Sequence, residues 1–205
     1  MIRYFSKEVV DKRIYPDPVL RQQAIPLEAI DAKDREMIDD MARRMYLYKG
    51  IGLAAPQIGI LLRVVVVNSG YGLIPLINPE IVESEGNTMG EEGCLSLPDV
   101  TVSITRNARI LVRGRDVNEK DVEFEASGLL ARVFLHEIDH LDGKLIIDKH
   151  NAETKEGKLY QQGSDKFLAK LRVADVTFYV EYSLAGDGAY TVHTAYSHRT
   201  ELGGE

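Results

Sequence analysis

Residues 135–143 read LHEIDHLDG and place two histidines, His136 and His140, four positions apart, with Glu137 between them. On an α-helix, positions four apart lie on one face, so both imidazoles can reach a single metal ion. Glu137 lies about 100° round the helix axis, where a carboxylate contacts a water on the metal better than the metal itself. The spacing predicts a metal-binding helix. The same spacing also occurs on ordinary helices whose histidines are solvated or packed in the core.

The composition fits one globular domain, with or without an appendage. The chain has 205 residues, enough to bury a substantial core. A net charge of −7 disfavours a protein that coats nucleic acid, because such binding depends on neutralising phosphates. The single cysteine, Cys94, excludes an intrachain disulfide and gives no sign of an oxidising compartment.

The N-terminus and the apolar runs indicate a cytoplasmic protein without a membrane span. The first ten residues, MIRYFSKEVV, carry charges inside any apolar core and make a poor signal peptide. The longest apolar run, IGILLRVVVV, is interrupted by Arg63 and is too short to cross a bilayer.

A first helix is expected from about Glu28 to Lys49. Its apolar residues recur at spacings of three and four, which is typical of a helix with one face on the core. A left-handed terminating residue is expected at Gly50. The apolar stripe consists of Met37, Ile38, Met41, Met45 and Tyr48.

The second helix is the one that carries the two histidines. It is expected to begin with Ser127 as its N-cap and to stop at Gly143. Leu129, Arg132 and Val133 share the face of His136, so a metal ion there would lie in a pocket with a partly apolar wall.

The remaining pattern is of short strands, and the sequence predicts an α+β fold. Antiparallel β-sheets are expected around the central metal-binding helix, with an N-terminal helix and a C-terminal appendage. The strand signals lie at residues 61–67, 100–106, 109–116 and 121–127. We expect a catalytic domain at residues 1–150 and an atypical tail at residues 151–205. In the tail, DKFLAKLRV suggests a short helix, whereas VTFYVEYSL and AYTVHTAYS suggest a β-hairpin.

A catalytic site of this kind usually needs a third protein ligand and an open position for water. The metzincin pattern would place a further histidine where Ile146 stands, which excludes that protease class. His150 lies beyond the end of the expected helix, and His193 and His198, in the expected hairpin, are expected to be structural or solvated. Cys94 remains, in the stretch EEGCLSLP, where flanking glycine and proline predict irregular backbone. A lone cysteine is, however, also commonly a small buried apolar residue.

Three stretches, GIGLAAPQIG at 50–59, EEGCLSLP at 91–98 and HEIDHL at 136–141, together resemble the motifs of the peptide deformylase family. The family's motifs read G-φ-G-φ-A-A-x-Q, E-G-C-φ-S and H-E-x-D-H-L, where φ is apolar. All three occur here in order. The resemblance covers about residues 10–148, including DPVLRQQA, and the proline after EGCLSL is similar to the bacterial first-class members.

The resemblance implies a hydrolase that removes the formyl group from N-terminal formylmethionine of new polypeptides. It assigns the metal to Cys94, His136 and His140, and acid and base catalysis to Glu137. It assigns stabilisation of the reacting oxygen to Gln57 and Leu95. One departure is Leu135, where the family usually has glutamine. Helical geometry turns this residue away from the histidines, so an altered surrounding and retained activity are expected.

Binding of the substrate is implied for Gly52, through its main chain. Ile51, Leu129 and Val133 are candidate walls for the methionine side chain, and each of them also fits ordinary core packing. Ligand types alone leave zinc, iron, nickel and cobalt open. The resemblance implies ferrous iron as the native ion, with zinc, nickel or cobalt as substitutes.

Two alternatives to a deformylase remain open. A thermolysin-like peptidase would need a downstream glutamate ligand, for which the sequence offers Glu153 and Glu156 without a convincing helical pattern. A non-enzymatic peptide-binding relative would have a decayed site, whereas every ligand position here is intact.

The expected partners are formylmethionyl peptides and, beyond them, a possible transient ribosome contact. Some bacterial relatives use a basic C-terminal helix for it, and residues 149–205 hold seven Lys or Arg against eight Asp or Glu. The oligomeric state stays open.

Overall fold

The structure is a computed structural model. It describes side chains and backbone for residues 12–70 and 72–149 and, beyond them, the backbone of four strands between residues 158 and 199. The chain divides into two compact units, one of residues 1–89, 95–98 and 105–145 and the other of residues 90–94, 99–104 and 146–205. Among the described residues, no helix is long and apolar enough to cross a membrane.

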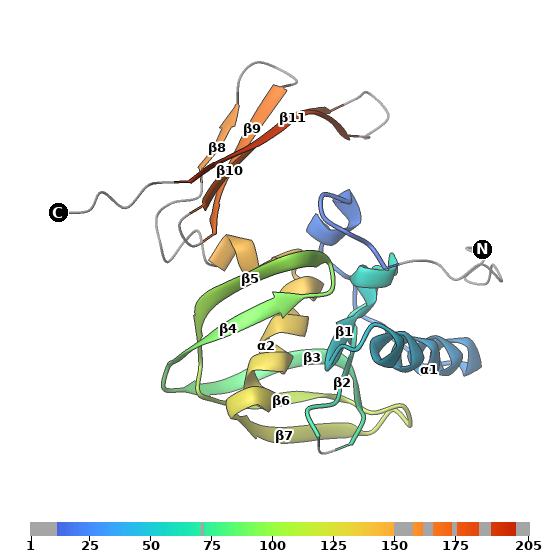
Figure 1. Ribbon diagram of the computed structural model, residues 1–205. Helices are drawn as coiled ribbons and strands as arrows, with labels where there is room; N and C mark the ends of the chain where they lie inside the picture. Colours follow the sequence, from blue (N-terminus) through green and yellow to red (C-terminus); the bar gives the residue numbers. More distant parts are fainter. Residues whose placement is uncertain are drawn as a thin grey trace. The chain divides into compact units, whose positions relative to one another are not determined.

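Five antiparallel strands form the main sheet, in the order β1-β2-β3-β6-β7 (Figure 1). The prediction of antiparallel strands is therefore confirmed, although two strands of this sheet had no clear signal in the sequence. The strands are β1 (Gly52–Ala54), β2 (Val64–Val67), β3 (Ile74–Glu85), β6 (Arg109–Arg115) and β7 (Asp121–Ser127).

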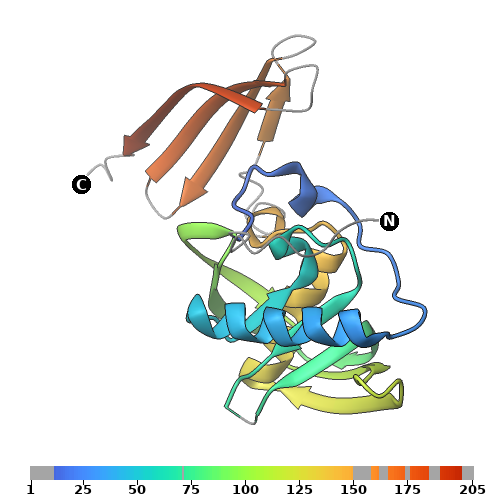
Figure 2. The same cartoon turned by 90° about the vertical axis from the view of Figure 1, so that its right-hand side faces the viewer.

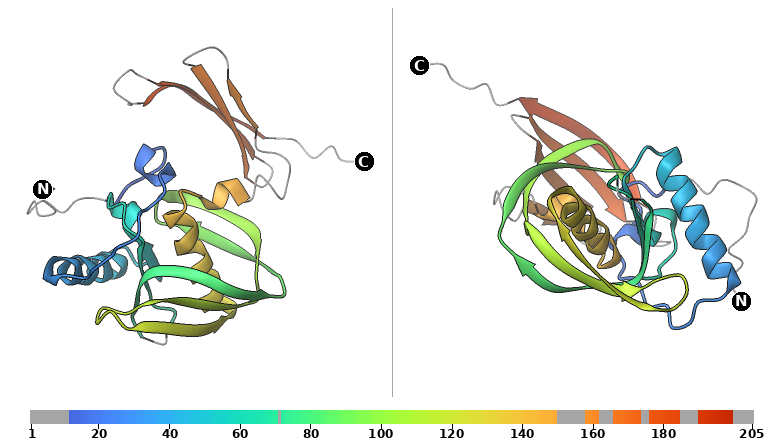
Figure 3. Two further views of the ribbon diagram at one scale, coloured as in Figure 1. Left: turned by 180° about the vertical axis from the view of Figure 1, so that it is seen from behind. Right: turned by 90° about the horizontal axis from the view of Figure 1, so that it is seen from below.

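Two helices cover opposite faces of this sheet at β1 and β2. Helix α1 (Ala32–Leu47) contacts both strands and lies across them in Figure 2. Helix α2 (Gly128–Leu141) contacts the same strands from the other side, as the right-hand view of Figure 3 shows. This explains why all four valines of β2 are buried: Val64 and Val66 join the core under α1, and Val65 and Val67 join the core under α2. A sheet covered on both faces favours such continuous apolar runs.

Helix α1 begins at Ala32, four residues later than expected. The Asp31 carboxylate accepts hydrogen bonds from the backbone N–H groups of Lys33 (2.7 Å) and Asp34 (3.0 Å), and the Asp34 carboxylate accepts one from the Asp31 N–H (2.9 Å). This capping box satisfies donors that the first turn leaves without helical partners. The hydrogen bond from the Asp34 N–H is the main cause that lowers the pKa of Asp31 below its usual value.

The end of α1 corrects a second expectation. The left-handed residue is Lys49, with φ of 57°, and Gly50 is not among the residues with positive φ. The helix ends at Leu47, and the Gly50 N–H donates to the Met45 carbonyl. Four members of the apolar stripe are confirmed, since Met37, Ile38, Met41 and Met45 are all buried, whereas Tyr48 is the C-cap and is only partly buried.

Helix α2 has the predicted bounds. Ser127 is its N-cap, although its side chain makes no capping hydrogen bond, and the chain turns away at Gly143 with φ of 69°. A β-carbon on residue 143 would lie 2.6 Å from the Arg21 carbonyl oxygen, so only glycine fits at this turn.

Strands β4 (Thr88–Cys94) and β5 (Leu97–Arg106) form a separate two-stranded sheet. The expectation of irregular backbone near Cys94 holds only in part: Cys94 is the last residue of β4, and Leu95 and Ser96 form a turn. The third ligand candidate thus lies where a strand ends and a tight turn begins.

A further sheet lies in the C-terminal region, with order β11-β10-β9-β8 and antiparallel pairing throughout. The predicted hairpin is confirmed by the pairing of β10 (Val176–Leu184) with β11 (Tyr190–Arg199). The predicted short helix is wrong, because Lys166–Val173 forms strand β9. This strand pairs with β10 on one side and with β8 (Lys158–Gln161) on the other, and such pairing overrides a weak local helix preference.

Candidate metal centre

Helix α2 carries three titratable side chains into the interior between residues 136 and 140. His136, Glu137 and His140 are 9%, 4% and 1% exposed. The two imidazole centroids lie 5.0 Å apart, with an angle of 63° between the rings. The spacing of four residues has therefore brought both rings to one face, as the sequence predicts.

Cys94 completes a cluster of three metal-ligating side chains. One ligand atom from each of Cys94, His136 and His140 lies within 4.8 Å of the other two. A cysteine sulfur and two imidazole nitrogens suit a first-row divalent ion. Three protein ligands leave a fourth tetrahedral position for water or substrate, so the donor set fits a catalytic metal ion.

Two hydrogen bonds hold the side chain of Gln57 beside the Leu95–Ser96 turn. Its side-chain oxygen accepts from the Ala54 N–H (2.8 Å), and its amide nitrogen donates to the Ser96 hydroxyl oxygen (3.3 Å). The side chain is 1% exposed. Because the oxygen is engaged by the backbone, the amide nitrogen is directed towards the Leu95–Ser96 turn that follows Cys94.

Gly52 and Val133 meet at Glu137. A β-carbon on residue 52 would overlap the Glu137 carboxylate and would lie 2.7 Å from Val133 Cγ1. The main chain of β1 therefore passes directly over the carboxylate. The structure thus brings Gly52, from a distant part of the sequence, against Val133 and Glu137, which lie four residues apart on α2.

The other two candidate walls are more exposed. Ile51 and Leu129 are 44% and 56% exposed, whereas Val133 is 5% exposed. Leu95 is partly buried and packs against the core under α1. Exposed apolar side chains are compatible with the rim of a substrate site, and Val133 lies deeper.

Sequence reasoning missed the roles of Ser96 and Arg106, two buried polar residues near these elements. They are 0% and 3% exposed, and Arg132, which the sequence places on the face of His136, is 8% exposed. The Arg132 guanidinium donates to the Thr88 carbonyl (2.9 Å). The sequence did contain a signal for Arg106. Residues 102, 104 and 106 lie on the same face of one strand, and the first two are apolar, so Arg106 shares the face that is expected to be buried.

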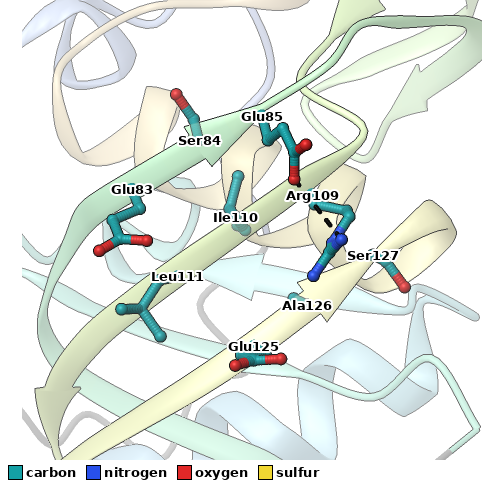
Figure 4. A pocket seen from close by; sticks show the side chains of 9 residues that line it. All are labelled: Glu83, Ser84, Glu85, Arg109, Ile110, Leu111, Glu125, Ala126 and Ser127. Carbon is teal, nitrogen blue, oxygen red and sulfur yellow. Dashed lines mark ion pairs between the residues drawn. The ribbon is translucent and has the colours of Figure 1, made fainter.

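A surface hollow of about 560 Å³ lies over β3, β6 and β7 (Figure 4). Its lining includes Glu83, Glu85 and Glu125, and Arg109 forms an ion pair with Glu85 (3.5 Å). None of the predicted site residues lines this hollow. Both charged partners are mostly exposed, and exposed pairs of this kind contribute little.

His150, Glu153 and Glu156 lie outside the described residues.

For the described part of the chain, a histidine pair with a glutamate between them and a cysteine nearby defines a metal-dependent hydrolase of the H-E-x-x-H type. The family model for polypeptide deformylases matches residues 11–156. The chain belongs to the polypeptide deformylase family.

Individual relatives agree with this assignment. A peptide deformylase from Thermodesulfovibrio yellowstonii is 49% identical over 146 residues, which are 69% of this chain and 88% of the relative. One from Halothermothrix orenii is 49% identical over 143 residues, covering 69% of this chain and 93% of the relative. The crystal structure of a peptide deformylase from Thermotoga maritima aligns with a TM-score of 0.67 at 45% identity, covering 68% of this chain and 96% of the other.

The activity follows from the family. The chain is a metal-dependent hydrolase that removes the N-formyl group from the formylmethionine of nascent polypeptides. The family model matches the region that contains all ten predicted site residues.

Proposed function

We propose that Cys94, His136 and His140 hold the metal ion of the deformylase and that Glu137 moves the protons of the reaction. One observation carries the proposal: a ligand atom from each of the three side chains lies within 4.8 Å of the other two. Glu137 is buried on the same helix, between the two histidines in sequence. Because burying a carboxylate is costly, its position next to this donor set supports a role in the reaction.

A divalent metal ion bound by these donors supplies a Lewis acid, which lowers the pKa of a water molecule and polarises the formyl oxygen. Glu137 takes a proton from the attacking water and delivers it to the departing nitrogen. The C–N bond of the formamide then breaks, and the products are formate and a free N-terminal amine. Water supplies the oxygen and both protons that the products gain.

Gln57 and Leu95 stabilise the negative charge that develops on the formyl oxygen. The main-chain N–H of Leu95 lies in the turn directly after Cys94, and the Gln57 amide is directed to the same turn by its bonds to Ala54 and Ser96. An amide nitrogen carries two N–H donors, and we assign one of them to the substrate oxygen. Donors fixed in this way before reaction cost no reorganisation during it.

The peptide substrate binds alongside β1. This strand is at the edge of its sheet and pairs only with β2 among the described strands. An extended peptide can therefore pair with the edge of β1 that faces away from β2, through main-chain hydrogen bonds at Gly52. Val133, Leu129 and Ile51 form the wall for the methionine side chain, with Val133 deepest.

Ferrous iron is the ion that we propose for the native enzyme, with zinc, nickel or cobalt as substitutes. The thiolate of Cys94 favours a transition metal over magnesium or calcium, which prefer oxygen ligands. The choice among transition metals rests on the resemblance to the family.

Residues 1–150 form the catalytic domain in this proposal and residues 151–205 a separate tail. We also propose the cytoplasm as the location, since the substrate is the N-terminus of a new polypeptide. Contact with the ribosome would be transient, because the tail lacks the excess of basic residues that binds RNA phosphates.

The test is release of formate from formyl-Met-Ala-Ser by protein reconstituted anaerobically with ferrous iron, together with metal analysis. We expect one ion per chain and release of formate without cleavage of casein. Cleavage of internal bonds in casein would support a thermolysin-like peptidase instead. Bound metal without formate release would support a binding protein with a decayed site.

A further inference from the structure

Arg106 is a cation buried at the end of β5. Its side chain is 1% exposed. It occupies the buried phase of the strand, in line with Val102 and Ile104, which are 3% and 0% exposed. Apolar residues normally fill such positions, since removing a charged group from water is costly unless it is paired.

The guanidinium contacts helix α2 at two positions. Its Nη1 forms an ion pair with the carboxylate of Asp139 and donates to the main-chain carbonyl of Leu135 (3.4 Å). Leu135 directly precedes His136, and Asp139 directly precedes His140. Arg106 therefore contacts the residue before each of the two histidines.

These contacts restrict the helix turn that presents both imidazoles. Leu135 and Asp139 are four residues apart, so they lie on one helix face, about 100° from the face of the histidines. A charge-assisted bond to this second face fixes the rotation of α2 about its axis and its depth in the core. A small rotation of the helix would move both ring nitrogens away from the sulfur of Cys94 together.

We infer that Arg106 is a positioning residue for the metal centre, acting through Asp139 and Leu135 on the orientation of His136 and His140. The inference rests on the proposed function, in which the two histidines hold the ion. Groups that orient metal ligands typically change metal affinity about 10- to 100-fold when they are removed. We expect a loss of this size in metal affinity from Arg106→Gln.

Cobalt(II) serves as the probe, because its visible spectrum reports ligand geometry and its near-ultraviolet band reports a thiolate ligand. The affinity of wild-type, Arg106→Gln, Asp139→Asn and the double variant for cobalt is measured by competition with a chelator on the full chain. Each single variant should bind cobalt about 10- to 100-fold more weakly. The double variant should lose about as much as either single variant, because both partners act as one unit.

Arg63, which directly precedes β2, provides a matched control because it contacts the same helix. It pairs with Asp142, the C-cap of α2, at 2.9 Å and also donates to the Pro79 carbonyl (3.3 Å). Arg63→Gln should lower the thermal stability of the apoprotein and leave cobalt affinity and spectrum as in the wild type. Arg106→Lys keeps the charge and should restore part of the affinity lost in Arg106→Gln.

The outcomes separate the inference from the proposed function. A wild-type cobalt complex without a thiolate band would overturn the ligand assignment itself. A normal wild-type complex, with Arg106→Gln and Asp139→Asn equal to it in affinity and visible spectrum, would overturn the inference alone, and Arg106 would then serve stability only. If Arg106→Gln does not fold, the isosteric Asp139→Asn decides by the same measurements.

Discussion

Gly52 lies against Glu137 so closely that the carboxylate occupies the space of a β-carbon on residue 52. The same β-carbon would lie 2.7 Å from Val133 Cγ1. Residue 52 belongs to β1, and Glu137 and Val133 belong to α2. The packing of a strand on a helix therefore fixes the position of the proposed proton carrier.

Gly52→Ala is expected to reduce kcat strongly, since the added methyl group must displace the Glu137 carboxylate from its site. Overpacking of this kind also costs about 1–3 kcal/mol of stability. The measurement is kcat for formyl-Met-Ala-Ser per folded, metal-loaded molecule, alongside thermal unfolding.

Gly114→Ala is the control for steric strain alone. Its β-carbon would lie 2.7 Å from Leu76 Cδ1 and 2.8 Å from the Ile77 carbonyl oxygen, between β6 and β3. A comparable loss of stability is expected with kcat preserved in the folded fraction. Equal kcat losses in the two variants would mean that strain in the sheet, and not displacement of Glu137, limits turnover.

The variant Glu137→Gln should bind the metal as the wild type does but have a strongly reduced kcat. The amide has nearly the same shape as the carboxylate but cannot accept the proton of the attacking water, and general acid–base catalysis typically contributes about 10²–10⁴-fold in rate. Metal content by elemental analysis and kcat are measured on one preparation. Wild-type kcat in this variant would reduce Glu137 to a structural residue.

Cys94→Ser should weaken metal binding severely, because a neutral hydroxyl replaces a soft anionic ligand. Serine has the same branching as cysteine with a smaller terminal atom, so the turn at Leu95–Ser96 should persist and the folded state should survive. Elemental analysis after dialysis against a chelator is the measurement. Full occupancy in the serine variant would remove Cys94 from the ligand set.

The site was more predictable from sequence than the sheet around it. The spacing of His136 and His140 fixes their face once a helix forms, whatever the surrounding fold. Cys94 is different, because nothing local connects it to His136 and His140, which lie 42 and 46 positions away. As the remaining candidate it could also be a small buried apolar residue, and the family motifs assigned it to the metal. Arg106 was overlooked because a lone cation at a strand end looks like a solvated residue until the burial of β5 is known.

Strand β3 shows why part of the fold escaped prediction. It contains Pro75 and Pro79, which cannot donate to a ladder, and Asn78, with φ of 51°. Its pairing with β6 shifts register between Ile77 and Glu80, so a bulge accommodates the irregular residues. These residues interrupt a strand pattern locally, and the non-local pairing with β6 extends the strand through them.

The ferrous enzyme should lose activity in air, whereas the nickel or cobalt forms should keep it. Oxidation of the iron or of the Cys94 thiolate destroys the centre, and a metal that resists oxidation removes the first of these routes. Activity half-lives are compared in oxygenated and anaerobic buffer. Equal half-lives of the iron and nickel forms in oxygen would contradict a ferrous centre.

Truncation after residue 150 is expected to preserve the metal and the turnover of a short formyl-peptide. The sheet β8–β11 pairs only within itself among the described strands, and the matched family region ends at residue 156. Its outermost strands, β8 and β11, each have one edge without a partner strand in the described part of the chain. Such edges invite pairing with another chain, so the truncation should change oligomeric state or thermal stability. Metal content, formate release and the mass in solution are measured for both lengths. A truncated chain that folds normally but no longer binds the metal would show that the tail contributes to the active site.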